Sequence, residues 1–203
     1  GSTCDVPLNE GNNDFTFWAL SSYGDSSEMG TLSAKVDTVS PALGLDIIAT
    51  SGSNGWYVSP ATITAIGSDS TSGLSSVFLS VDNGAWISST TLNEGMYSIV
   101  VQAEDNAGNI ANSTTTISVD TTTPTIDVSV NGTTGSNGWY SSSMQVSATS
   151  NDATSGVASL ESSLDGGVYQ AYTSPFSFAD GYHTVQFKAV DRAGNETETS
   201  IQE

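Results

Sequence analysis

The segment GSNGWY at 52–57 returns letter for letter at 135–140, so Trp139 follows Trp56 by 83 positions. Three extra residues around 173–175 raise the spacing to 86 further along the chain. Matching pairs at these spacings are V-D-T at 36–38 and 119–121, D-x-T-S-G at 69–73 and 152–156, D-x-G at 82–84 and 165–167, and A-x-D-x-A-G-N at 103–109 and 189–195. Such fixed spacing is typical of tandem structural repeats. The sequence therefore predicts two full units, 37–119 and 120–203.

Residues 1–36 contain part of a third unit. Leu-Asn-Glu-Gly at 8–11 matches the same letters at 92–95, and Phe15 and Phe17 take the places of later strand residues. The loop that follows, SSYGD at 21–25, departs from the A-x-D-x-A-G-N pattern. We interpret 1–36 as the C-terminal part of a unit whose front strands are absent. An unpaired edge of that kind favours strand addition by another chain or an adjoining unit.

Apolar residues alternate with polar ones throughout the two full units, and no segment has helical periodicity. This alternation is typical of half-buried strands. The expected inward positions include Leu43, Leu45 and Ile47; Ala61, Ile63 and Ala65; Val77, Leu79 and Val81; and Ile99, Val101 and Ala103. Roughly seven strands in ~80–100 residues predict a two-sheet sandwich of the immunoglobulin type. Tyr97 stands where such a fold has a tyrosine corner, and His183 takes its place in the second unit.

The charge of the chain excludes some classes of partner. The 203 residues contain 22 Asp and Glu against 3 Lys and Arg, a formal net charge of -19. Such a surface repels nucleic acid and anionic lipid, and the chain has no apolar run of membrane-spanning length. The single cysteine, Cys4, excludes an intrachain disulfide. We therefore expect neither nucleic acid binding nor membrane insertion.

Together, V-D-T-x-x-P at each junction, G-W-Y, D-x-x-S-G, D-[NG]-G and A-x-D-x-A-G-N resemble bacterial Ig-like (Big-type) repeats. The resemblance covers 37–203 and, weakly, the first 36 residues. It implies an all-β tandem of Ig-like sandwiches from a secreted or cell-surface protein such as a giant adhesin. The partners it implies are neighbouring Ig-like repeats of the same protein. Because a fold hosts many functions, the resemblance predicts architecture better than activity.

Polar residues gather where an Ig-type sandwich would bring the B–C and F–G loops beside the entry of the chain. The predicted metal ligands are Asp37, Asp69, Asp105 and Asn109 at the head of the first repeat, and Asp120, Asp152, Asp191 and Asn195 at the head of the second. Three carboxylates and an amide oxygen suit Ca²⁺, which takes ~6–8 oxygen ligands. The resemblance adds to this expectation, since similar adhesin repeats hold calcium at their junctions. The alternative is that these side chains only cap turns through their own backbone.

No constellation for catalysis is apparent. His183, the single histidine, has no Ser or Cys motif beside it, and carboxylate pairs are unspecific in so acidic a chain. We expect a non-catalytic spacer or stalk outside the cell. Two alternatives stay open: an adhesive module that binds glycans or proteins through exposed tryptophans such as Trp18, and an accessory module of a secreted hydrolase.

Overall fold

The computed structural model describes residues 5–178 and 180–202, with the backbone only at 200–202. Every regular element among these residues is a β-strand. No helix in this described part is long and apolar enough to cross a membrane. The predicted all-β class is therefore confirmed, whereas the prediction for Cys4 lies outside the described residues.

The partial unit is an antiparallel hairpin of β1 (Gly11–Phe17) and β2 (Gly30–Val36). Phe15 pairs with Leu32 and Phe17 with Gly30, so these four residues share one face. Phe17 and Leu32 are each 58% exposed. Alternation correctly predicts which face is apolar. A two-stranded sheet by itself cannot bury that face, because burial needs a second layer.

Residues 37–119 contain the seven strands expected of one repeat among the described residues. They are β3 (Ala42–Ile48), β4 (Trp56–Tyr57), β5 (Ala61–Ser68), β6 (Leu74–Val81), β7 (Ser89–Leu92), β8 (Gly95–Asp105) and β9 (Ile110–Val119). One sheet has the order β3-β5-β7 and the other β4-β9-β8-β6. The inward positions predicted on β5 and β8 are buried, including Ile63 and Ile99 at 0% exposure. The two sheets and their strand order are those of an Ig-like sandwich.

Two local features of this repeat bear on the sites below. The Tyr97 hydroxyl donates to the backbone oxygen of Glu94 at 3.1 Å, which confirms the tyrosine corner. Trp56 and Tyr57 form the short strand β4, which runs parallel to β9 and pairs with Ser118 and Val119. Strand pairing therefore ties the tryptophan loop to the end of the repeat.

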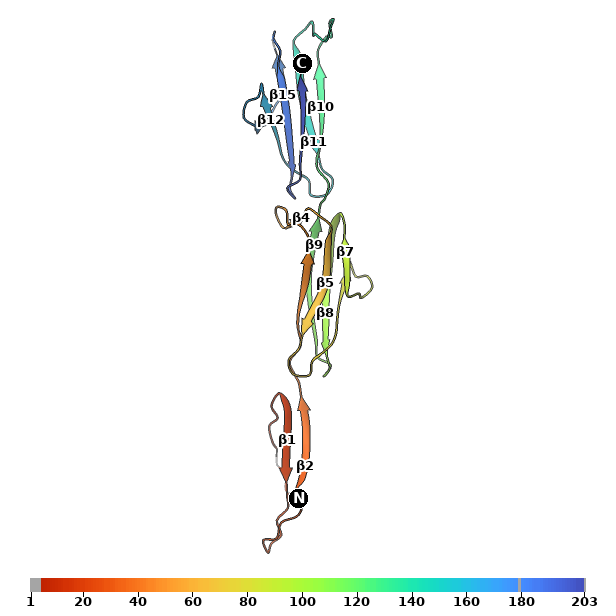
Figure 1. The fold of residues 1–203 in the computed structure, drawn as a ribbon, viewed down its shortest axis with the longest axis vertical. Helices are drawn as coiled ribbons and strands as arrows, with labels where there is room; N and C mark the ends of the chain where they lie inside the picture. Colours follow the sequence, from red (N-terminus) through yellow and green to blue (C-terminus); the bar gives the residue numbers. More distant parts are fainter. Residues whose placement is uncertain (1–4, 179, 203) are drawn as a thin grey trace. The chain divides into compact units, whose positions relative to one another are not determined.

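Residues 120–203 repeat this plan except at one edge of the larger sheet, where the counterpart of β4 is not a strand. The strands are β10 (Thr125–Asn131), β11 (Met144–Asn151), β12 (Val157–Leu164), β13 (Gln170–Ala171), β14 (Phe176–Phe178), β15 (Thr184–Asp191) and β16 (Glu196–Gln202). They form the sheets β10-β11-β14 and β13-β12-β15-β16, which lie together in Figure 1.

The core of this repeat comes from both of its sheets. Met144, Val146 and Phe178 of one sheet pack with Val185 and Phe187 of the other. The edge of the Tyr172 ring meets the Phe187 ring at 5.4 Å between centroids. Face-to-face packing of two sheets is the defining feature of a β-sandwich.

By its contacts the chain divides into two compact units. The first contains the chain up to Asp46 together with Thr64–Thr90 and Ser98–Thr115; the second contains Ile47–Ile63, Thr91–Tyr97 and the chain from Thr116 onward. The predicted ligands at the head of the first repeat all lie in the first unit, and those of the second repeat in the second unit. The repeat boundaries after residues 36 and 119 stay a prediction.

Candidate metal centres

The aspartates predicted at each repeat head come together. Asp37, Asp69 and Asp105 form the first head cluster, and Asp120, Asp152 and Asp191 form the second. In each cluster, one carboxylate oxygen from every residue lies within 4.8 Å of the others. Asp37 and Asp120 directly follow β2 and β9 and open the next repeat. Asp69 and Asp152 directly follow β5 and β11, and Asp105 and Asp191 end β8 and β15. The Ig-like topology therefore places three distant carboxylates at one point.

Each aspartate also caps a turn. In the second head cluster, Asp152 Oδ1 accepts from the amides of Thr154 (3.2 Å) and Gly156 (2.7 Å), and Asp191 Oδ1 accepts from Gly194 (2.7 Å) and Asn195 (2.9 Å). These bonds are typical of aspartate turns. Both of these bonds to Asp152 use Oδ1, so its Oδ2 takes no part in this turn. Turn capping and convergence are therefore both present.

The two asparagines predicted as metal ligands donate hydrogen bonds through their side-chain amide nitrogens. The Asn195 amide nitrogen donates to the backbone oxygen of Asp120 at 3.0 Å and to Asp191 Oδ2 at 2.8 Å. Asn109 makes the same pair of bonds to Asp37 and Asp105, at 3.1 Å and 2.8 Å. The amide therefore joins the linker to the F–G loop and orients one carboxylate of each cluster. That the amide oxygen is a metal ligand stays a prediction.

The central carboxylates of both clusters are buried. Asp105 and Asp191 are 1% exposed and Asp120 is 0% exposed. Burial, a hydrogen bond with Glu94 and the charge of Asp152 raise the pKa of Asp120 above its ordinary value of 3.8. Burial opposes ionisation of Asp105 too, but bonds from Asn109 and from backbone amides lower its pKa. Close, buried like charges of this kind are stabilised by a cation.

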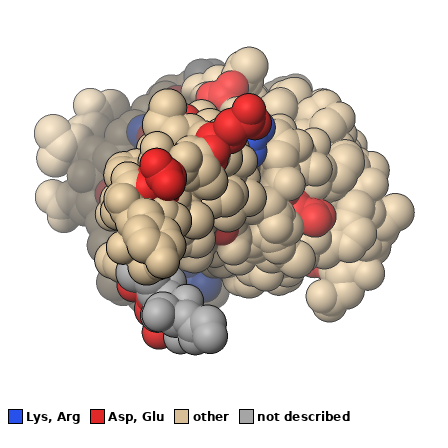
Figure 2. Space-filling model, turned by 90° about the horizontal axis from the view of Figure 1, so that it is seen from below, with Lys and Arg blue, Asp and Glu red and all other residues tan. Residues whose placement is uncertain are grey.

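The described side chains supply no such cation. Two ion pairs occur among them, His183 with Asp165 at 3.1 Å and Lys188 with Glu196 at 2.9 Å, and neither involves a head cluster. On the face drawn in Figure 2, acidic side chains are scattered among uncharged ones rather than joined in one patch. An all-oxygen donor set with no nitrogen or sulfur fits a hard cation such as Ca²⁺.

Sequence reasoning missed a glutamate that holds the linker. Glu94 Oε2 accepts from the amide and hydroxyl of Thr121, both at 2.8 Å, and Oε1 accepts from the Thr122 hydroxyl at 3.0 Å. Burial alone would raise the pKa of Glu94, but hydrogen bonds from Thr154, Thr121 and Asp120 lower it from 4.5 to about 2. Glu10 binds the amide of Thr38 at 3.1 Å in the same way. The recurrence of Leu-Asn-Glu-Gly was the sequence feature that could have indicated these two glutamates.

The remaining candidates have structural surroundings. The ring of His183 stacks on Phe178 at 4.8 Å between centroids and contacts Asp165, which fits the structural role expected for it. Trp18 is 56% exposed, as the outward position of its side chain predicts.

Comparison with known proteins gives the same picture. Residues 50–121 match the family model described as Bacterial Ig-like domain, which confirms the resemblance seen in the sequence. No curated protein matches the chain.

Two solved structures are similar at low identity. The fibronectin(III)-like modules of Clostridium thermocellum CbhA are 17% identical, with a TM-score of 0.38 over 78% of this chain and 92% of theirs. A tetra-tandem repeat in the extending region of a large adhesion protein is 15% identical, with a TM-score of 0.32 over 97% of this chain. This chain covers 57% of that one.

Proposed function

We propose that this chain is a set of non-catalytic structural repeats of a secreted or cell-surface protein, stiffened by Ca²⁺ at the repeat heads. Bacterial Ig-like domains are typically non-catalytic modules, and residues 50–121 match that family. The observation that carries the calcium proposal is the second head cluster, in which three carboxylate oxygens converge within 4.8 Å on a buried linker aspartate.

The geometry supports a mechanical role for the ion. Asp120 belongs to the linker, Asp152 to the loop before β12, and Asp191 to the end of β15. A cation shared by all three would hold the linker against two loops of the following repeat. It would also remove the repulsion among these charges, which otherwise opposes their approach. Pro124 fixes φ just before β10, so the linker between Asp120 and the first strand has little slack.

Thermal unfolding in millimolar CaCl₂ and in chelator tests this proposal. Because the ion binds where the three groups converge in the folded state, it stabilises the fold by RT ln(1 + [L]/Kd), about 2.7 kcal/mol at a hundredfold excess over Kd. We expect a higher melting temperature in calcium and saturable binding by calorimetry. Identical melting curves in the two buffers would leave turn capping as the sole role of the clusters.

Exposed tryptophans favour a second candidate, an adhesive module that binds glycans. Trp18 and Trp86 are 56% and 48% exposed, and exposed indoles stack on sugar rings. A glycan array with the wild-type chain and with Trp18→Ala separates the two functions. Specific binding that the variant loses would assign an adhesive role; no binding in either case would leave the spacer role.

A further inference from the structure

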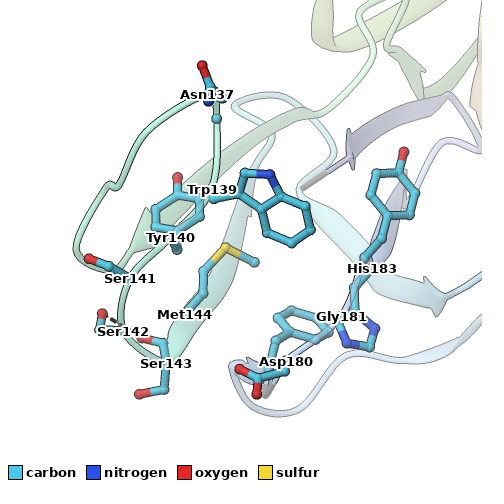
Figure 3. A pocket seen from close by; sticks show the side chains of 13 residues that line it. Asn137, Trp139, Tyr140, Ser141, Ser142, Ser143, Met144, Asp180, Gly181 and His183 are labelled. Carbon is cyan, nitrogen blue, oxygen red and sulfur yellow. Dashed lines mark hydrogen bonds between the residues drawn. The ribbon is translucent and has the colours of Figure 1, made fainter.

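A hollow of about 970 Å³ lies where β11 and β15 begin, and the second head cluster is at the other ends of these two strands. The loop before β11 and the turn before β15 form its two sides (Figure 3). In Figure 3, Trp139 reaches over Met144, with Asp180 and Gly181 on the other side of the opening. Trp139 is 65% exposed. An opening of this size beside an exposed indole is typical of a surface that binds another molecule.

The loop on one side of this hollow, 135–140, has the same shape as its counterpart in the preceding repeat, 52–57. In the preceding repeat the amide of Gly52 donates to Trp56 O at 2.8 Å, and that of Trp56 to Ser53 O at 3.0 Å. The matching bonds in the second are 2.6 Å and 3.2 Å long. The asparagines of the two loops, Asn54 and Asn137, have φ values of 53° and 55°. The loop is therefore preformed in both repeats.

In the preceding repeat, loop 52–57 forms hydrogen bonds with the repeat that follows. The Ser53 amide donates to Ala193 O at 2.6 Å, and the Asn54 side chain donates to Arg192 O at 2.8 Å. A Cβ on Gly52 would lie 2.3 Å from Ala193 O, so a glycine is needed for this approach. Loop 52–57 thus holds the D-x-A-G-N loop at 191–195 through three neighbouring positions.

The end of the preceding repeat that carries loop 52–57 also binds the linker to the next repeat. Tyr57 O accepts from the Asp120 amide at 2.9 Å, and Glu94 accepts from Thr121 at 2.8 Å. Repeat spacing places Tyr140 and Asp180 at the corresponding positions beside the hollow. Asp180 keeps a carboxylate where Glu94 has one. The residues that bind the head loop and those that bind the linker therefore both have counterparts at the hollow.

We propose that this hollow is the docking surface for the D-x-A-G-N head loop of a further Ig-like repeat placed in series after residue 203. Ser136 and Asn137 donate to the backbone oxygens of that loop, Gly135 admits its approach, and Trp139 is covered by it. This inference rests on the proposed function, since it supposes repeats joined end to end. Beyond that function, it names the residues through which consecutive repeats contact each other.

An extended chain tests the proposal. Residues 118–203 are joined directly after Glu203, which puts the Asp120 of the added copy 86 positions after the first. Amide hydrogen exchange at Ser53 and Ser136 is then compared in both chains. The two serines lie in identical GSNGWY segments, so their intrinsic exchange rates match. In the original chain we expect Ser136 to exchange much faster than Ser53; in the extended chain it should slow to the rate of Ser53.

A variant and a second measurement keep the result interpretable. Asn137→Gly retains the positive φ and removes the donor, so it should restore part of the fast exchange at Ser136. Asn112→Ala, an exposed site on β9, should leave that exchange unchanged. Fast exchange at Ser136 in an extended chain whose added repeat is folded would overturn the proposal. So would specific binding of an oligosaccharide that quenches Trp139 in the original chain.

The exchange comparison is made in calcium and in chelator. Slow exchange of Ser136 in both buffers supports docking even where calcium leaves the melting temperature of the original chain unchanged. Failure of the calcium proposal and failure of the docking proposal are thus separate results.

Discussion

The side-chain amide of Asn195 donates to the backbone oxygen of Asp120 at 3.0 Å, across 75 residues of chain. With its second bond, to Asp191, it connects the linker, the F–G loop and the second head cluster. Asn109 and Asp37 repeat this relationship at 3.1 Å. Because one amide serves all three parts, its removal should affect stability before any ion is present.

Asn195→Ala should therefore destabilise the fold in chelator. The change leaves a buried carboxylate and a backbone oxygen without their donor, which costs about 1–3 kcal/mol. Urea unfolding followed by fluorescence measures the loss. Asn112→Ala, which removes an exposed side-chain bond to Gln102, is the matched control and should cost less than about 0.5 kcal/mol. Equal losses in the two variants would contradict the linking role of Asn195.

Asp191→Asn should abolish most of the calcium effect on melting. The amide keeps an oxygen that accepts the turn amides but has no charge for the cation. In chelator the variant should lose some stability, because its amide nitrogen takes the place of Oδ2 and faces the donating amide of Asn195, although one of three converging charges is gone. In calcium, the expected gain of about 2.7 kcal/mol at a hundredfold excess over Kd should largely disappear.

Asp127→Asn is the control for charge, since Asp127 is exposed on β10 and is not a member of the second head cluster. This variant should keep the full calcium effect. Equal loss of stability by Asp191→Asn in calcium and in chelator would reduce Asp191 to a turn cap.

Glu94→Gln should make the fold less sensitive to acid. The pKa of Glu94 is lowered from 4.5 to about 2 in the folded state, so its ionised form contributes stability that is complete above about pH 4.5. That contribution is lost as the pH falls from there toward 2. The wild-type chain should lose its advantage over the variant within this window.

Unfolding midpoints measured between pH 6 and 2 in chelator check this result. Glu104→Gln, at an exposed position on β8, should run parallel to the wild-type chain throughout. A constant difference between Glu94→Gln and the wild-type chain at all pH values would show that the charge of Glu94 has no part in holding Thr121.

Much of this architecture follows from local sequence. Alternation on β5 and β8 predicts the buried face because a strand presents every second residue to one side. Tyr97 is recognised because the corner depends on residues close in sequence. The three aspartates of each head are found because an Ig-like topology fixes which loops meet.

Other features depend on contacts that local sequence does not specify. The hydrogen bond from the Ser53 amide to Ala193 O depends on where the linker directs the next repeat, and nothing within 52–57 indicates this bond. Glu94 was visible as a repeated letter, but the sequence does not indicate which partner a loop glutamate binds. Phe17 was expected on an inward face, and it is 58% exposed because no second sheet covers it among the described residues.

This exposed face yields the last prediction, self-association of the chain through the β1–β2 hairpin. Phe17 and Leu32 are on the same side of the sheet, and each outer edge of a two-stranded sheet offers free backbone groups. Adding a strand and covering these side chains would contribute about 1.5–3 kcal/mol for each one fully buried. Light scattering should therefore show concentration-dependent dimers, and Phe17→Ser should shift the chain toward the monomer. Phe78→Ser, at a residue 42% exposed on β6, is the matched control and should leave the association unchanged. A wild-type chain that stays monomeric at high concentration would show that the hairpin tolerates its exposed face without strand addition.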